Sequence, residues 1–123
     1  MRRRPGHGDS QAAAIVAAHG WNDETMADSV DRASVDRARE RITGLIRRTP
    51  TFRTTVPTVH GAVPVIFKLE FLQYGGSFKV RGSLNALLHA EEDGRLDDAG
   101  VVIASGGNAA IGAAWASRLR GVK

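Results

Sequence analysis

The sequence contains no cysteine, which excludes a disulfide framework and any thiol chemistry. Its four histidines do not follow the spacing of metal ligands, so no metal site is expected. No apolar run approaches the roughly 18 residues that cross a membrane, and no internal repeat or low-complexity tract is present. Lysine is also scarce, since 14 of the 17 basic residues are arginine. A lysine at an unusual position, such as Lys79, is therefore notable.

The 123 residues amount to about one small domain, with an ordinary globular mix of 42% hydrophobic and 24% charged residues. The net charge is +4. Residues 1–25 contain three arginines and three acidic residues, so the whole excess lies in residues 26–123. The arginines there are scattered, whereas a nucleic-acid-binding face needs a concentrated basic patch. The composition therefore predicts neither a nucleic-acid partner nor a membrane partner.

The first 25 residues differ from the rest of the chain. Arg2–Arg4 followed by the short apolar stretch 12–18 could be a secretory signal, but seven weakly apolar residues are at the lower limit for one. A disordered extension, or translation upstream of a true start at Met26, explains the same features. We favour this second interpretation and assign residues 1–33 to a disordered extension.

A helix and a strand are expected next. Ser34 is predicted to cap the helix, and Pro50 forces its end. The apolar residues at helical spacing are Val35, Ala38, Ile42, Leu45 and Ile46. Residues 63–69 are rich in β-branched and aromatic residues and are predicted to form a strand, which Pro64 places at a sheet edge.

A second helix, a second strand and a third helix follow. Ser77 is predicted to cap the second helix, which ends near Asp93 and Gly94. Its apolar side consists of Val80, Leu84, Leu87 and Leu88. Residues 101–105 read as a short buried strand of the parallel-sheet kind. Gly121 closes the third helix.

This order predicts an α/β protein, specifically part of a three-layer fold with a mostly parallel sheet. Two strands make an incomplete sheet, and Val122 would be a natural first residue of another strand. We therefore expect residues 34–123 to be the N-terminal part of a larger domain, truncated at its C-terminus. We also expect the chain alone to be only marginally stable.

The glycine-rich stretch 105–112, "SGGNAAIG", lies between the second strand and the third helix. Backbone N–H groups at such a helix start favour an anion. The stretch fails both phosphate-loop patterns, because the G-x-G-x-x-G spacing is absent and Ala113 and Ala114 replace the P-loop lysine and hydroxyl residue. A plain tight turn, with Asn108 as a helix N-cap, remains the alternative.

Lys79 stands at the start of the second helix, where the helix dipole disfavours a cation. The dipole and partial burial beside Phe78 would both favour a neutral amine. A neutral amine is a nucleophile that condenses with an aldehyde. Lys68 is the competing candidate, and we expect it to form an ion pair with Glu70 or to be exposed.

Three segments resemble the pyridoxal-phosphate (PLP) enzymes of the tryptophan-synthase-β fold type, and among them the threonine/serine dehydratases. The first shared pattern is K-x-E-x-x-Q followed by G-S-F-K-x-R-G. It is matched at Lys68, Glu70, Gln73, Gly76, Ser77, Phe78, Lys79, Arg81 and Gly82. The second is the S-x-G-N-x-A loop at Ser105, Gly107, Asn108 and Ala110, and the third is "RRTP" at residues 47–50.

The departures from the family pattern bear on specificity. Val80 follows the lysine where cysteine synthases and threonine synthases usually have Asp, which argues against those relatives. Gly106 stands where serine racemases carry a serine, which disfavours racemase activity. Phe71, Gly75, Ser83 and Ala109 also differ from the frequent family residues, and we expect them to affect packing more than chemistry.

The resemblance implies a role for each matched residue. Lys79 would bind PLP covalently and act as the catalytic base, Phe78 would pack against the pyridine ring, and Asn108 would hydrogen-bond to its 3′-oxygen. Ser105 and Gly107 would hold the substrate carboxylate. The phosphate-binding loop and the partner of the pyridine nitrogen would lie further along a family chain.

The implied reaction is β-elimination from a hydroxy amino acid such as threonine or serine, which yields a 2-oxo acid and ammonia. The implied enzyme is cytoplasmic and, when complete, a homo-oligomer. The alternative is a non-catalytic remnant, or a module that binds a partner across its open sheet edge. On either interpretation, the 123-residue chain alone is expected to be inactive.

Overall fold

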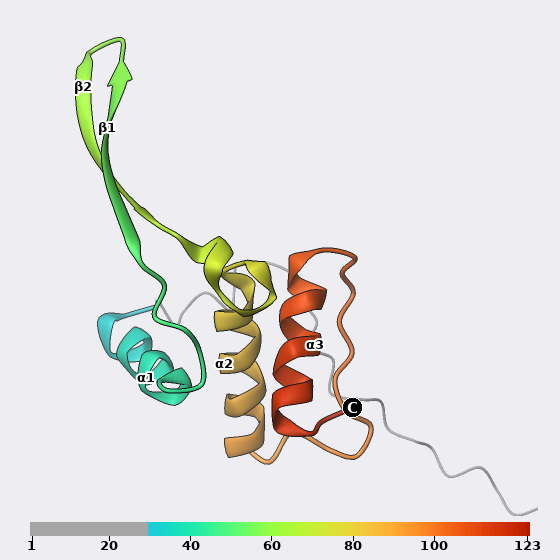
Figure 1. Cartoon of the computed structure of the whole chain (residues 1–123). Helices are drawn as coiled ribbons and strands as arrows, with labels where there is room; N and C mark the ends of the chain where they lie inside the picture. The colour runs from blue at the N-terminus through green and yellow to red at the C-terminus, as the bar shows by residue number, and fades with distance from the viewer. Residues whose placement is uncertain (1–29) are drawn as a thin grey trace, which may run out of the picture.

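The computed structural model describes residues 30–123, which form a helical body with a long hairpin extending from it (Figure 1). The elements in chain order are α1 (Arg32–Ile42), β1 (Thr51–Thr58), β2 (Gly61–Lys68), the 3-10 helices η1 (Glu70–Leu72) and η2 (Tyr74–Gly76), α2 (Lys79–Glu92) and α3 (Asn108–Arg120). The predicted α/β class is confirmed. Residues 1–29, which hold most of the expected extension, lie outside the described residues.

Helix α1 begins two residues before the predicted cap. Asp31, not Ser34, is the N-cap: its Oδ1 accepts a hydrogen bond from the Ser34 backbone N–H at 2.7 Å. The Ser34 hydroxyl instead donates to the Asp31 carbonyl at 2.8 Å. The prediction of Ser34 was wrong because Asp is an equally good cap, and the positive end of the helix dipole favours its charge.

Helix α1 also ends well before Pro50. The backbone becomes extended at Thr43 and takes a positive φ of 80° at Gly44, a conformation that suits glycine. Leu45 and Ile46 still pack against the core, but from a loop rather than from the helix. The apolar spacing therefore correctly indicated packing at Ile42, Leu45 and Ile46, but Val35 is 51% exposed, and the spacing overestimated the length of the helix.

The predicted strand at residues 63–69 is confirmed as β2, although its partner β1 was not predicted. The two strands form an antiparallel pair, and this pair is the sheet found among residues 30–123. The predicted parallel sheet and three-layer arrangement therefore stay predictions. Pairing of Phe52 with Phe67 and of Val56 with Val63 places four apolar side chains on one face of the hairpin, where all four are exposed.

The second predicted strand, residues 101–105, does not form as an element of the described chain. Val102 alone has bridge geometry there, and the Val101 N–H donates to the Lys123 carbonyl at 2.9 Å. A strand requires hydrogen-bonded neighbours along its length. Residues 30–123 place no strand beside this segment, so its β propensity alone does not make it a strand.

Helices α2 and α3 form the centre of the body and run side by side in the same direction (Figure 1). Gly112, in the first turns of α3, lies against the backbone of Lys79 and Val80 at the start of α2, while Arg120 pairs with Glu91 near the far ends. The buried cluster between the elements consists of Ile42, Leu84, Leu87, Leu88 and Ala116. The predicted apolar side of α2, its end at Asp93, and the closure of α3 by Gly121 are all confirmed.

Candidate functional site

The parallel packing of α2 and α3 places their N-termini at the same end of the body (Figure 1). Lys79 is the first residue of α2, and Asn108 is the first residue of α3. A Cβ atom at Gly112 would lie 3.1 Å from the Lys79 carbonyl carbon, so a side chain at this position would force the two backbones slightly apart. The structure thus brings two residues that are far apart in sequence to neighbouring helix ends.

Lys79 is exposed, and its Nζ lies 4.8 Å from the ring centroid of Phe78, which is itself 56% exposed. The expected partial burial of Lys79 is therefore wrong within the described chain, because no described element covers this end. Phe78, not the predicted Ser77, occupies the N-cap position of α2, although the Ser77 hydroxyl accepts a hydrogen bond from the Lys79 backbone N–H at 3.4 Å. A neutral amine at Lys79 stays a prediction.

The loop before α3 is exposed, and the Gly107 N–H donates to the Ser105 hydroxyl at 3.3 Å. Gly107, not Asn108, is the N-cap of α3, so the alternative of Asn108 as a cap is wrong. Within the described residues, no side chain caps the start of α3, since the N-cap is a glycine. The Asn108 amide therefore lies next to the first N–H groups of the helix, which favour an anion.

A group of polar residues surrounds Arg81 in the first turn of α2. We call it the Glu70 cluster, and its members are Thr49, Lys68, Glu70 and Arg81. Arg81 donates two hydrogen bonds to the Glu70 carboxylate, at 2.7 and 2.8 Å. The Lys68 Nζ lies 3.3 Å from the same carboxylate and donates to the Thr49 hydroxyl at 2.7 Å. The expected Lys68–Glu70 ion pair is confirmed, which assigns Lys68 a structural role.

The electrostatics of the Glu70 cluster follow from these contacts. The Arg81 guanidinium lowers the pKa of Glu70 from 4.5 to about 2, assisted by hydrogen bonds from Thr49 and Lys68 and opposed by burial. The shift corresponds to about 3 kcal/mol in favour of the ionised carboxylate. Arg81 lies two residues after Lys79, so the cluster fixes the first turn of α2 and with it the base of the Lys79 side chain.

Gln73 provides a second connection to the same segment. Its buried side chain accepts from the Arg47 N–H at 3.0 Å and donates to the Arg47 carbonyl at 2.7 Å. The Arg47 guanidinium lies 4.4 Å from the ring centroid of Tyr74, and that ring stacks on Trp115 of α3 at 4.7 Å. The motif at residues 47–50 is thus bound to Gln73 by hydrogen bonds and to Tyr74 of η2 by a cation–π contact, and the Tyr74 ring connects it to α3.

Sequence reasoning missed what Thr49 and Gln73 do. Both are polar and buried, with 5% and 3% of their surfaces exposed, and the partners described above are 19 to 26 residues away in sequence. Their presence in two separate motifs was the available signal. The structure shows why those motifs occur together: the residues of one satisfy the backbone and side chains of the other.

Comparison with known proteins shows the family of the chain. The family model described as "Pyridoxal-phosphate dependent enzyme" matches residues 42–123. The chain is 45% identical over 85 residues to the L-threo-3-hydroxyaspartate ammonia-lyase of a Pseudomonas species, which covers 69% of this chain and 26% of that protein. It is 40% identical over 93 residues to the phenylserine dehydratase of Ralstonia pickettii, covering 75% and 28%.

A further relative is a serine racemase of Oryza sativa subsp. indica, 32% identical over 99 residues, which are 80% of this chain and 29% of that protein. The chain therefore spans between 26% and 29% of the length of these three relatives. No solved structure gives a significant match. No helix among residues 30–123 is both long and apolar enough to cross a membrane.

Proposed function

The chain belongs to the family of pyridoxal-phosphate-dependent enzymes, and we propose that, within a full-length enzyme, it helps to convert a hydroxy amino acid such as threonine or serine to a 2-oxo acid and ammonia by β-elimination and hydrolysis. The observation that carries the proposal is the shared end of α2 and α3, where Lys79 and Asn108 each begin a helix. Two relatives support the reaction type, because their names describe an ammonia-lyase and a dehydratase.

The residues at this end fit the aldehyde-bearing side of PLP. Lys79 presents an exposed primary amine, the group that condenses with an aldehyde. The exposed face of Phe78 offers an apolar surface for a planar ring. The Asn108 amide, unused in helix capping, would donate to the 3′-oxygen. We assign the partners of the phosphate and of the ring nitrogen to segments of a family chain beyond residue 123.

PLP, when bound, supplies an electron sink for the charge that develops at the α-carbon of the amino acid. The Lys79 amine would then accept the α-proton, which requires the amine to be neutral at that step. Ser105, Gly107 and the first N–H groups of α3 would hold the substrate carboxylate at the positive end of the helix dipole. Loss of the β-hydroxyl and hydrolysis would give the 2-oxo acid and ammonia.

A labelling experiment tests the assignment of Lys79. Incubation of the chain with PLP, reduction with borohydride and peptide mapping should place the label on Lys79. The three lysines lie in separable peptides, at positions 68, 79 and 123, so the result is unambiguous. Label on Lys68 at the expense of Lys79 would refute the assignment, because the Glu70 cluster should occupy that amine.

A chimera tests the reaction. Residues 42–123 would replace the matched segment of the Ralstonia phenylserine dehydratase, to which the chain is 40% identical. We expect ammonia release from threonine or serine, and its loss in the Lys79→Ala chimera. We also expect no D-serine, since Gly106 stands at the position assigned to the racemase serine. Light scattering of the same chimera would test the expected homo-oligomer.

A second candidate is a non-catalytic module that binds a protein partner through the hairpin. It rests on the exposed apolar face at Phe52, Val56, Val63 and Phe67. A chimera that folds and binds PLP yet releases no ammonia would favour this candidate over the enzyme.

A further inference from the structure

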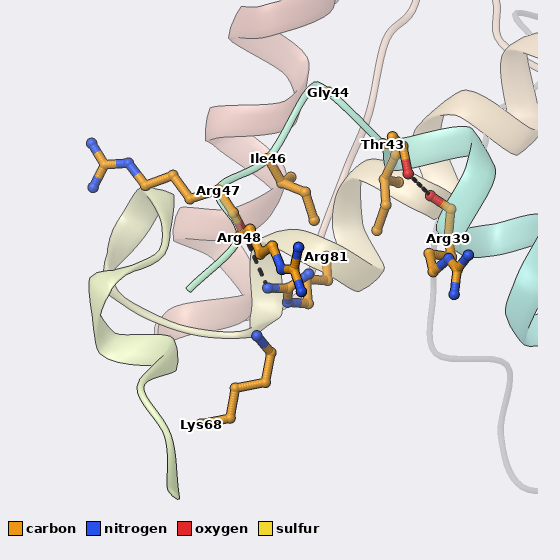
Figure 2. Close-up of a pocket in the computed structure, with 9 residues that line it drawn as sticks. Arg39, Thr43, Gly44, Ile46, Arg47, Arg48, Lys68 and Arg81 are labelled. Atoms are coloured by element: carbon orange, nitrogen blue, oxygen red, sulfur yellow. Dashed lines mark hydrogen bonds between the residues drawn. The ribbon is translucent and has the colours of Figure 1, made fainter. Parts of the chain in front are cut away.

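A pocket of about 520 Å³ lies on the body between α1, the loop that follows it, the end of β2 and the start of α2. Its lining residues are Arg39, Ile42, Thr43, Gly44, Ile46, Arg47, Arg48, Lys68 and Arg81 (Figure 2). Five of the nine are cationic, and none is acidic. The volume lies within the range of small-molecule sites, about 300–1,000 Å³.

Among residues 30–123, the cations of this pocket outnumber the carboxylates that contact them. Glu70 neutralises one charge, although both Lys68 and Arg81 contact it. Arg39 reaches Asp36 only at 3.9 Å, and Arg48 forms no ion pair within residues 30–123. Figure 2 shows the Lys68 ammonium pointing toward the Arg48 and Arg81 side chains. The Arg47 side chain points away from them, in agreement with its contact to Tyr74.

The floor of the pocket is apolar. Ile42 is buried and belongs to the core cluster, and Ile46 packs against that cluster. A cationic rim over an apolar floor is suited to a ligand with an anionic group and an organic body. Guanidinium groups favour phosphate, because their planar donors can bind two of its oxygens at once.

We propose that this pocket binds a small organic phosphate, with the phosphate at Arg48 and Arg39 and the organic body over Ile46. Lys68 and Arg81 contribute positive potential while remaining bound to Glu70. The pocket involves none of the residues assigned to PLP or to the substrate carboxylate, so it is a site additional to the proposed active site.

Phenyl phosphate is the test ligand, because it has no aldehyde and cannot react with Lys79. Titration of the full 123-residue chain by calorimetry should show saturable binding to one site. Arg48→Gln should weaken it about tenfold, as expected for loss of a charge-assisted hydrogen bond. Arg39→Gln should weaken it too. Binding should also weaken between about 0.01 M and about 1 M salt, as the screening length falls from about 30 to about 3 Å.

Arg37→Gln is the matched control. It removes one positive charge from α1, the helix that also contains Arg39, but Arg37 is exposed and does not line the pocket. We expect the affinity of this variant for phenyl phosphate to match that of the unmodified chain. Circular dichroism should show unchanged helix content in all three variants, since each substituted arginine is exposed.

Two further ligands complete the test. Inorganic phosphate should bind more weakly than phenyl phosphate if Ile46 contacts the organic body, and benzoate should bind more weakly than either. Absence of saturable binding would overturn the proposal, as would an equal loss of affinity in Arg37→Gln. Benzoate binding as tight as that of phenyl phosphate would overturn the assignment to phosphate. A failure here would leave the Lys79 labelling result unaffected.

Discussion

Arg81 donates two parallel hydrogen bonds to the Glu70 carboxylate, Nε to Oε2 at 2.7 Å and Nη2 to Oε1 at 2.8 Å. The pair joins the first turn of α2 to the segment that leaves the hairpin. Only 18% of the Glu70 side chain is exposed, so the interaction is weakly screened by solvent. Arg81 lies two residues after Lys79 in the same helix turn. The stability of the Arg81–Glu70 pair is therefore linked to the position of the proposed PLP-binding lysine.

Glu70→Gln should lower the free energy of unfolding by about 2–3 kcal/mol, because the substitution removes the charge that Arg81 and Lys68 stabilise. Urea denaturation measures this. Glu40→Gln is the control, since Glu40 is exposed on α1 and forms no ion pair among the described residues. Equal losses in both variants would show that net charge, not the Glu70 cluster, sets the effect.

The lowered pKa of Glu70 also predicts a pH dependence. A carboxyl group whose pKa is lower in the folded state stabilises the fold above its unfolded pKa and loses that contribution as pH falls. Stability should therefore decrease by about 3 kcal/mol between about pH 5 and about pH 2. Denaturation at a series of pH values should show a much smaller slope in Glu70→Gln. Some slope should remain, because the Ser34 backbone N–H lowers the pKa of Asp31 too.

Gly112→Ala should destabilise the chain by about 1–3 kcal/mol, the usual cost of overpacking. The new Cβ would lie 2.9 Å from the Ser83 Oγ and 3.1 Å from the Val80 backbone nitrogen, and the backbone cannot yield easily. Gly82→Ala on α2 is the matched control, because nothing lies within 4 Å of its Cβ position. Alanine should stabilise that helix by up to about 1 kcal/mol. Opposite signs in thermal melts would confirm the packing argument.

The stacked pair Tyr74 and Trp115 should show a coupling energy of about 0.5–1.5 kcal/mol in a double-mutant cycle. The cycle compares Tyr74→Ala, Trp115→Ala and the double variant by urea denaturation. Additive losses would mean that the rings contribute only by their separate burial.

Phe52→Thr combined with Phe67→Thr should make the chain more soluble without lowering its stability by more than about 1 kcal/mol. The two side chains pair across the hairpin and are 55% and 48% exposed, so they bury little apolar area in this chain. Light scattering at rising concentration measures self-association. A large loss of stability would contradict the expectation that this face is unpartnered within the chain.

The helices were predictable because local signals specify them. Val80, Leu84 and Leu87 recur at helical spacing and are buried, and Gly121 ends α3 with a positive φ as its position predicted. The exact helix starts were less predictable. Asp31 and Ser34 are both good caps, and which of them acts as the cap depends on backbone geometry that composition does not encode.

The sheet was less predictable, because a strand depends on its neighbours. Residues 101–105 have high β propensity but gain a single described backbone partner at Lys123. In the site, too, local features were predictable and contacts with distant segments were not. Motifs placed Lys79 and Asn108 at helix starts, whereas the exposure of Lys79 and the contacts of Thr49 and Gln73 depend on distant segments.

The Glu70 cluster and Gln73 hold the chain at both ends of the hairpin that lie next to the body. Arg47 and Thr49 precede β1, Lys68 is the last residue of β2, and Glu70 and Gln73 follow it. The turn between the strands can therefore change length without moving the start of α2. Closing a longer loop costs little, about 0.6 kcal/mol for each doubling of its length. Insertions near Val59 and His60 should be tolerated, and this tip is where a peptide tag could be placed while Lys79 keeps its position.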